Sequence, residues 1–256
     1  MDSHKRYLHQ ANWTKDLRDY IFEKVGLNET SRALEVGCGT GAILSQINFP
    51  VYGLDLDLSA LKEAKVHIQA SSSPLIGRDE SRVTRKLTCG DAFSLPYADS
   101  SFEILFCHFL LLWLPNPEIA LKEMKRVTVP SGHIIFFAEP DYSQRIDKPA
   151  ELAKLGKWQT DALRARGANP DIGGELAEIC YEAGIKIIET GTLSTSTREA
   201  STDERTNEWE TLKADLAEIA PNADIQKMKK IDAEAWMRGE RVLDIPTYYL
   251  WGKNQV

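Results

Sequence analysis

The chain predicts an α/β fold in which helices cover both faces of an open, doubly wound sheet. Short apolar segments alternate along the chain with amphipathic ones, as the strands of a parallel sheet alternate with their crossover helices. The first apolar segment ends in a glycine-rich turn, and an acidic residue follows each of the next two. With 256 residues, 43% of them hydrophobic, the chain can bury a full core, and we expect residues 1–256 to form a single domain.

The glycine-rich turn is the most informative segment. Ala33-Leu34-Glu35-Val36-Gly37-Cys38-Gly39-Thr40-Gly41 is typical of a buried strand that enters a turn with three glycines at alternate positions. Because glycine has no Cβ, a ligand can approach the backbone, and a helix predicted to begin near Thr40 directs unpaired N–H groups toward it. The segment predicts a nucleotide-type cofactor site. Gly37, Gly39 and Ala42 also satisfy the G-x-G-x-x-[GA] fingerprint of dinucleotide binding, so the turn alone does not identify the cofactor.

An acidic residue follows the second predicted strand, residues 50–54. Asp55 stands at the carboxyl end of that strand, 18 positions beyond Gly37. In nucleotide-binding sheets an acidic side chain about 20 residues beyond the glycines reaches a ribose diol. We therefore expect Asp55 to bind a ribose.

A second carboxylate follows the third predicted strand, residues 83–89. Asp91 lies in Gly90-Asp91-Ala92, which reaches the same edge of the sheet. A carboxylate there can accept a hydrogen bond from an adenine amino group while Leu56 or Phe93 covers the ring. This segment predicts the adenine end of the site.

The fourth and fifth predicted strands, residues 102–107 and 133–138, supply the far wall of the cleft. The fourth runs into His108 and an apolar segment that ends at Trp113. The fifth is almost wholly apolar, as a central parallel strand should be, and residues 139–142 break it at the same edge.

The remaining segments predict three helices and two strands. Asn116 is expected to cap a helix that has Pro117 at its first position and ends at Val127. Further helices are expected over residues 150–166 and from Ile172 to Gly184, and strands over residues 185–193 and 245–251.

Two amphipathic segments flank this scaffold. Residues 1–28 predict an N-terminal helical lid, with Trp13, Leu17 and Ile21 at helical spacing. Residues 198–240 predict a charged helical insertion over the substrate side of the cleft, with Trp209 on its apolar face.

These landmarks resemble the class I S-adenosylmethionine-dependent methyltransferases of the small-molecule type, related to the ubiquinone and menaquinone biosynthesis enzymes. The resemblance covers about residues 30–140 and rests on Glu35-Val36-Gly37-Cys38-Gly39-Thr40-Gly41, Asp55, Gly90-Asp91-Ala92 with Leu95-Pro96, Trp113-Leu114-Pro115-Asn116-Pro117 and Pro130-Ser131-Gly132-His133. In the last of these, Ser131 replaces a glycine that the family usually has.

The resemblance implies a Rossmann-like, seven-stranded sheet whose last strand lies antiparallel beside the fifth, with a helical cover. It also implies that S-adenosylmethionine is the cofactor and that Glu35 lies near its methionine amino group. The residues that we expect to bind it are Trp13, Glu35, Gly37, Cys38, Gly39, Gly41, Asp55, Leu56, Gly90, Asp91, Ala92 and Cys107.

The implied activity is methyl transfer by in-line displacement to a small, partly apolar or aromatic metabolite. Phe109, Trp113, Tyr142 and Tyr248 are the expected substrate-binding residues. A base is needed only if the acceptor is protonated at neutral pH. His108 has a suitable place and an ordinary pKa near the working range, and Glu139 is the second candidate catalytic residue. We expect His4, His9, His67 and His133 at the surface.

Two alternatives differ from this activity. A dehydrogenase is disfavoured because Glu35 would place a negative charge near a pyrophosphate, whereas the same carboxylate suits the ammonium group of a methionine-like tail. A protein that binds S-adenosylmethionine or S-adenosylhomocysteine without methyl transfer, as a regulator or a repurposed catalyst, stays open. The acceptor, the atom methylated and the oligomeric state also stay open.

Composition argues against other classes of partner. The net charge of −7 lacks the basic footprint of a nucleic-acid binder. The chain also lacks an Asn/Asp-Pro-Pro-Tyr sequence after the fourth strand, which disfavours a nucleic-acid or protein-glutamine substrate. No apolar stretch approaches the ~18–20 residues of a membrane span and the N-terminus is polar, so we expect a cytoplasmic protein without a membrane partner. The four cysteines are scattered without a C-x-x-C pair, which predicts neither zinc nor disulfides.

Overall fold

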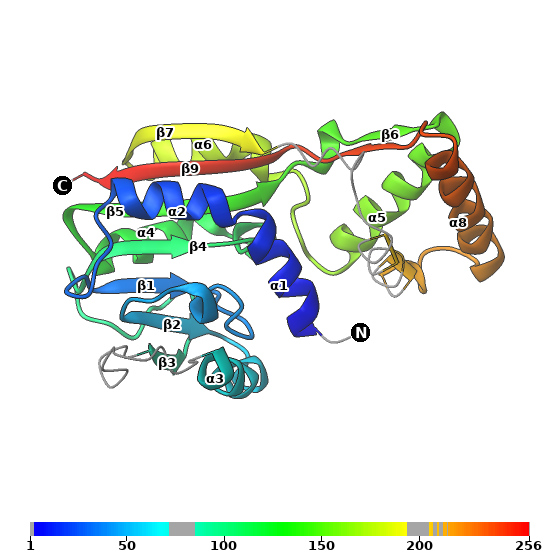
Figure 1. Cartoon of the computed structure of the whole chain (residues 1–256). Helices are drawn as coiled ribbons and strands as arrows, with labels where there is room; N and C mark the ends of the chain where they lie inside the picture. The colour runs from blue at the N-terminus through cyan, green and yellow to red at the C-terminus, as the bar shows by residue number, and fades with distance from the viewer. Residues whose placement is uncertain are drawn as a thin grey trace.

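The computed structural model describes residues 3–71, 85–193, 205, 206, 209, 212, 213 and 215–255. Its main sheet has seven strands in the order β3-β2-β1-β4-β5-β9-β7 (Figure 1). The strands are β1 (Ala33–Val36), β2 (Val51–Asp55), β3 (Arg85–Cys89), β4 (Phe102–Cys107), β5 (Thr128–Pro140), β7 (Ile185–Leu193) and β9 (Thr247–Asn254). The pairs among β1 to β5 are parallel, and β9 lies antiparallel between β5 and β7. The predicted doubly wound sheet with an antiparallel last strand is confirmed.

Helices cover both faces of this sheet. Along β5, Ile134 and Phe136 belong to one apolar cluster and Ile135 and Phe137 to another, because successive side chains of a strand point to opposite faces. The first cluster includes α4 (Pro117–Val127) and α6 (Ile172–Glu182), and the second includes residues of α1 (Ser3–Trp13), α2 (Lys15–Lys24) and α3 (Leu58–Ser71).

The N-terminal segment forms two helices that meet at Thr14. Helix α2 belongs to the core, since the Phe22 ring centroid lies 5.2 Å from that of Phe106 and 5.3 Å from that of Phe137. Helix α1 continues past the carboxyl ends of β1 and β2 (Figure 1). Of these two helices, α1 is therefore the one placed to cover a site at that edge.

Two local predictions were wrong. A helix was expected after the glycine turn, but only the 3₁₀ helix η1 (Leu44–Gln46) is present. Few residues separate Gly41 from β2, and Pro50 disfavours a helical conformation at Phe49, so there is no room for a longer helix. Asn116 precedes α4 as expected, but its side chain makes no capping hydrogen bond.

A small second sheet was not predicted. β6 (Ile146–Lys148) pairs antiparallel with β8 (Val242–Asp244), beside α8 (Asn222–Met237). The helix expected over residues 150–166 appears as η5 (Ala150–Leu152) followed by α5 (Ala153–Ala165). We call this unit, residues 146–165 with residues 205–244, the cover.

The cover has its own apolar core. Trp209, Leu212 and Leu216 of the predicted insertion pack with Leu152 and Leu155. The described part of residues 198–240 thus lies against η5 and α5, while residues 198–204, 207, 208, 210, 211 and 214 lie outside the described residues.

A buried ionic network ties the cover together. Asp232 accepts hydrogen bonds from Trp209 Nε1 at 2.7 Å and from Arg241 Nε at 2.5 Å. Asp147 lies 2.9 Å from Arg241 and accepts from Arg145 Nε at 2.6 Å. The four charged side chains are at most 7% exposed, and two arginines balance two aspartates. Charges can be buried in this way only when they are paired and hydrogen-bonded.

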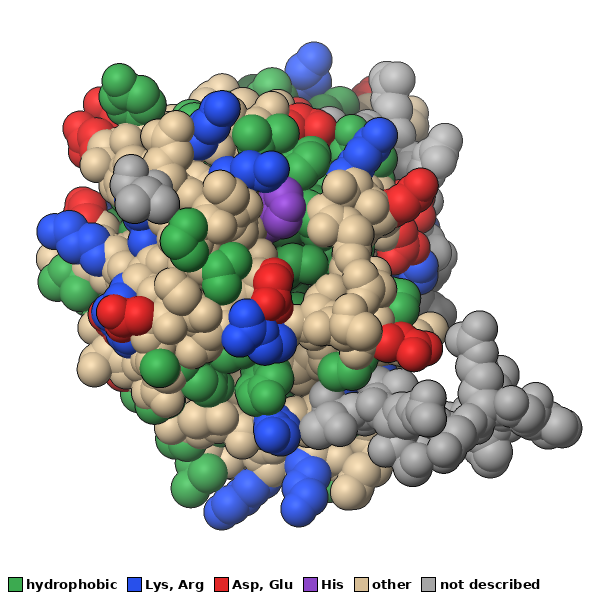
Figure 2. Space-filling view, turned by 90° about the vertical axis from the view of Figure 1, so that its left-hand side faces the viewer, with side chains coloured by type: hydrophobic (Ala, Val, Ile, Leu, Met, Phe, Trp, Pro, Cys, Tyr) green, Lys and Arg blue, Asp and Glu red, His purple; other side chains and the backbone are tan. Residues whose placement is uncertain are grey.

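The surface carries mixed charge. On the face in Figure 2, basic, acidic and apolar side chains are interspersed. None of the helices in the described ranges is long and apolar enough to cross a membrane.

We predict that Asp232→Ala lowers the free energy of unfolding by about 3–5 kcal/mol, because Arg241 would keep a buried charge with one partner fewer. Chemical denaturation monitored by circular dichroism measures the change. Lys229→Ala, on the exposed face of the same helix, is the control and should change stability by less than about 0.5 kcal/mol. Equal effects of the two substitutions would show that the network contributes nothing to stability.

Candidate functional site

A cavity of about 330 Å³ lies at the carboxyl ends of β1, β2, β4 and β5. Of the residues predicted from the sequence it is lined by Glu35, Gly37, Cys38, Gly39, Asp55, His108, Phe109, Trp113 and Tyr142. The lining is completed by Tyr7, Gln10, Ala42, Leu110, Leu112 and Pro140, and by three residues that sequence reasoning did not suggest, Arg6, Ile43 and Leu163. The structure thus brings the predicted cofactor and substrate sides into one space.

The glycine turn forms one wall. Gly37, Gly39 and Gly41 have φ angles of +76°, +50° and +75°, which residues with a Cβ rarely adopt. A Cβ at Gly37 would lie 2.8 Å from Leu110 Cδ1, so the backbone there is packed closely against the turn after β4. Gly41 instead faces α3, where a Cβ would lie 3.1 Å from Ala64. Its contribution to the site is therefore the shape of the turn.

Glu35 presents an unused acceptor to this cavity. Its side chain is buried at the end of β1, and Oε2 has no hydrogen-bond partner among the described residues. Burial raises the pKa of Glu35 to about 8, although the charge of Arg18 opposes this shift and that of Asp55 adds to it. A buried oxygen without a partner fits a ligand that brings a cationic N–H donor.

Asp55 lies across the turn from Glu35. Its Oδ2 accepts from the Gly39 N–H at 2.7 Å and its Oδ1 from the Asp57 N–H at 2.9 Å. Since an ionised carboxylate has about four lone-pair sites, each oxygen can accept one bond more. Asp55 can therefore hold the turn and a pair of ligand hydroxyls together.

The predicted adenine residues lie on the same edge, outside the cavity. The Gly90 N–H donates to the Asp55 carbonyl at 3.0 Å, which brings the ends of β2 and β3 together. Leu56 is 71% exposed, and Asp91 is exposed with its Oδ1 accepting from the Phe93 N–H at 2.9 Å. Ala92 is buried beneath them. This edge of the sheet is therefore exposed to solvent, with an apolar surface at Leu56 and a carboxylate at Asp91, and we call it the open shelf.

Three other predicted residues do not line the cavity. Cys107 is fully buried in the core at the end of β4. The Trp13 ring is tilted against Phe109, with 6.4 Å between the ring centroids. The Tyr248 hydroxyl accepts from Gln144 Nε2 at 2.9 Å.

Glu139 has a task that the sequence did not suggest. Its fully buried carboxylate accepts from the N–H groups of Leu110, Leu111 and Leu112 at 3.1, 3.0 and 3.2 Å. Burial raises its pKa to about 7, although the three backbone donors lower it. Glu139 thereby holds the turn that carries Phe109, whose φ of +52° is unfavourable for a bulky residue. We therefore interpret Glu139 as a support of the cavity wall.

His108 lies in the cavity wall and contacts the N-terminal helices. Its Nε2 is 2.9 Å from Thr14 Oγ1, and Thr14 Oγ1 in turn accepts from Arg18 at 2.8 Å. Burial, with the nearby charge of Arg18, lowers the pKa of His108 to about 3. The expectation of a pKa near the working range was wrong, because Arg18 and the burial could not be read from the sequence. His108 is neutral at pH 7 and a weak base.

Helix α1 is fastened to the glycine turn. His4 Nδ1 lies 2.8 Å from Thr40 Oγ1, and the His4 ring stacks on His67 at 3.3 Å between centroids. The prediction that His4 is a surface residue was therefore wrong. Arg6 and Gln10 line the cavity from the same helix, and the i, i+4 spacing from Gln10 was the sequence signal that could have identified Arg6.

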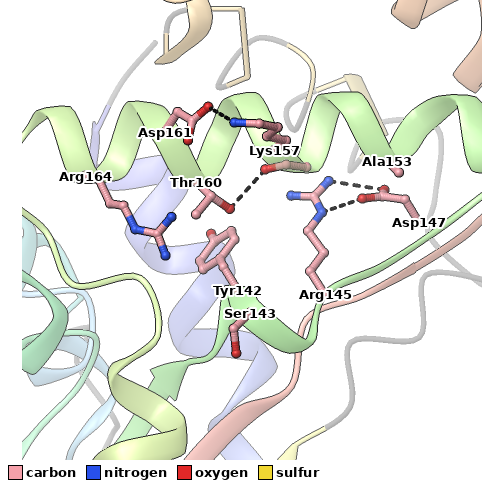
Figure 3. A pocket seen from close by; sticks show the side chains of 10 residues that line it. Tyr142, Ser143, Arg145, Asp147, Ala153, Lys157, Thr160, Asp161 and Arg164 are labelled. Carbon is pink, nitrogen blue, oxygen red and sulfur yellow. Dashed lines mark hydrogen bonds and ion pairs between the residues drawn. The ribbon is translucent and has the colours of Figure 1, made fainter.

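A second cavity of about 340 Å³ shares Tyr142 with the first. Figure 3 shows the side chains that line the second cavity. It lies between α5 and residues 142–147, which include η4 (Tyr142–Gln144). Its cations are ion-paired, Arg145 with Asp147, Lys157 with Asp161 and Arg164 with Asp171. Gly156 allows the close approach of α5, since a Cβ would lie 2.6 Å from Asp147 Oδ2.

Comparisons with known proteins agree with this geometry. Residues 34–136 match the family described as a methyltransferase domain. An uncharacterized methyltransferase of Schizosaccharomyces pombe is 26% identical over 93% of this chain and 87% of its own length. Demethylmenaquinone methyltransferase of Staphylococcus aureus is 32% identical over 46% of this chain, and the match spans only 47% of that relative.

A solved structure has a similar fold. The cyclase SpnF matches 94% of this chain and 81% of its own chain with a TM-score of 0.60 and 22% identity. The matched domain contains the glycine turn, Asp55 and Asp91, three of the features on which the sequence resemblance rests. The chain therefore contains a methyltransferase domain over residues 34–136, and these similarities support an S-adenosylmethionine-dependent methyltransferase.

Proposed function

We propose that the chain binds S-adenosylmethionine across the glycine turn and transfers its methyl group to a small, partly apolar or aromatic acceptor. The observation that carries this proposal is the unpartnered Oε2 of Glu35, buried beside Asp55 in one cavity. A methionine-type ammonium and a ribose diol would satisfy these two carboxylates together. When bound, the cofactor supplies an electrophilic methyl group on its sulfonium.

The chain's own residues divide the binding task along the sheet edge. Glu35 would accept from the ammonium and Asp55 from the ribose hydroxyls. Asp91 and Leu56 would hold the adenine on the open shelf, where a carboxylate can accept from the amino group and an apolar side chain can cover the ring.

The acceptor side lies opposite the glycine turn. Phe109, Trp113 and Tyr142 offer aromatic surface, and Leu112 and Leu163 add aliphatic contacts. In-line displacement needs an acceptor atom held about 3–3.5 Å from the methyl carbon, so positioning supplies most of the acceleration. Helix α1, which His4 holds against the glycine turn, lines the cavity with Arg6, Tyr7 and Gln10 and helps to exclude water. The second cavity gives room behind Tyr142 for an extended acceptor.

A second candidate function is cofactor binding without methyl transfer. The similarity to SpnF favours it, because that protein is described as a cyclase. An incubation experiment distinguishes methyl transfer from cofactor binding alone. The protein is incubated with S-adenosylmethionine and a panel of phenols, quinols, carboxylic acids and amines. Mass spectrometry then measures S-adenosylhomocysteine and methylated products. Acceptor-dependent S-adenosylhomocysteine formation is expected. Tight cofactor binding with no turnover of any acceptor would favour the second function.

We predict that S-adenosylhomocysteine binding releases a proton at pH 7. The free carboxyl of Glu35, with a pKa of about 8, is mostly protonated, and an ammonium beside it favours the ionised form. Because binding lowers this pKa, affinity should rise with pH up to about pH 8, by at most tenfold per pH unit. Calorimetry in buffers of different ionisation enthalpy measures the proton released.

Glu35→Gln should remove both the proton release and the pH dependence. Glu29→Gln, an exposed control near the start of β1, should change neither. Proton uptake on binding, or an affinity that is flat between pH 6 and 8, would show that the cofactor ammonium does not lie at Glu35.

We predict that Asp55→Ala weakens S-adenosylhomocysteine binding by about 1.5–3 kcal/mol, the range for hydrogen bonds to a charged group. Asp57→Ala is the matched control, because Asp57 is an exposed neighbour. Within the described residues, its side chain accepts a hydrogen bond only from the Ser59 N–H. Titration calorimetry on both variants decides. A dissociation constant for Asp55→Ala equal to that of the control would contradict the ribose assignment.

A further inference from the structure

We propose that Thr14 and Arg18 hold His108 as a neutral imidazole whose proton is on Nδ1, so that His108 donates a hydrogen bond to an oxygen of the acceptor. The proposal rests on the proposed function for the presence of an acceptor, and on the geometry of three side chains for the position of the proton. It assigns Thr14 and Arg18 the role of positioning residues for His108.

Thr14 lies where α1 ends and α2 begins, and its side chain is fully buried. Three groups that can accept a hydrogen bond surround its hydroxyl: His108 Nε2 at 2.9 Å, the Ala11 carbonyl at 3.3 Å and the Gln10 carbonyl at 3.4 Å. A hydroxyl has one hydrogen to donate. His108 Nε2 is the nearest of the three.

Arg18 strengthens the preference for His108. Its NH1 donates to Thr14 Oγ1 at 2.8 Å and to the Ala11 carbonyl at 2.6 Å. A hydroxyl that accepts from a cation becomes a stronger donor, since hydrogen bonds in a chain polarise one another. The Ala11 carbonyl already has a donor, so Thr14 gains most by donating to His108 Nε2.

An imidazole that accepts at Nε2 and is neutral carries its proton on Nδ1. Burial and the charge of Arg18, which lower the pKa of His108, keep the ring neutral. In the described residues Nδ1 has no hydrogen-bond partner, and the ring lines the cavity at right angles to Phe109, 4.7 Å between centroids. The N–H is therefore available to a molecule in the cavity.

A donor at this place selects a class of acceptor. It suits a carbonyl oxygen or the oxygen of an already ionised phenol or enol, which can accept from the N–H. It does not remove a proton from a neutral alcohol, because Nδ1 has no free lone pair. His108 would touch the acceptor without changing its own protonation.

Nitrogen NMR of the folded protein tests the proposal. The chain is labelled with ¹⁵N-histidine, and long-range ¹H–¹⁵N correlations at pH 7, with and without S-adenosylhomocysteine, distinguish the two neutral tautomers. His108→Asn identifies the signals of His108. We expect the tautomer with the proton on Nδ1. A wild-type His108 with its proton on Nε2 would overturn the proposal.

Two Thr14 variants test the positioning role. Thr14→Val keeps the side-chain shape without the hydroxyl and should move at least part of the His108 population to the Nε2–H form. Thr14→Ser should restore the wild-type spectrum. A Thr14→Val protein that is folded by circular dichroism and has an unchanged His108 spectrum would contradict a role for Thr14. If Thr14→Val does not fold, the wild-type and Thr14→Ser spectra still decide the tautomer.

The tautomer measurement is independent of cofactor binding. Failure of S-adenosylhomocysteine to bind would count against the proposed function and leave the His108 spectrum of the free protein to be judged by itself.

Discussion

The parallel pairing of β1 with β2 on one side and β4 on the other is the constraint on which the site depends. Glu35 is paired with Gly53 and with Phe106, so the turns that follow all three strands leave the sheet at one edge. The order β3-β2-β1-β4-β5 reverses direction at β1, and α3, between β2 and β3, packs on one face of the sheet while α4, between β4 and β5, packs on the other. A crevice at such a switch point is where open α/β sheets bind ligands.

Beside this crevice, burial and the charge of Arg18 have opposite effects on the pKa of Glu35. Burial disfavours the ionised form of Glu35, while the charge of Arg18, which is equally buried, favours it. The Arg18 guanidinium donates hydrogen bonds to Thr14, the Ala11 carbonyl and Gln46. It would have to break these bonds to form an ion pair with Glu35. The carboxyl therefore has a pKa of about 8 and is mostly protonated at pH 7. A ligand cation of modest affinity is then sufficient to ionise it.

The sequence predicted those parts of the molecule that are encoded locally. The strand-to-glycine turn and Asp55 follow from patterns within about 25 residues, and the sheet order follows from the family resemblance. The interruption between helices α1 and α2 at Thr14 was not predicted, because the Thr14 hydroxyl is paired with His108, which lies 94 positions away in the sequence. The role of Glu139 was missed for the same reason, since its partners are backbone groups that sequence patterns do not identify.

The two sides of the cavity are stabilised by different means. The cofactor side is formed by strand ends, whose positions the sheet fixes through backbone hydrogen bonds. The acceptor side is formed by the turn that Glu139 holds and by α5, whose Leu163 lines the first cavity. Helix α5 is backed by the apolar core of the cover and by the Arg145–Asp147–Arg241–Asp232 network. Because that network lies outside the sheet, the α5 part of the acceptor wall is supported separately from the strand ends, whereas the turn held by Glu139 packs directly against Gly37; Tyr142 lines both cavities and lies where the two supports meet.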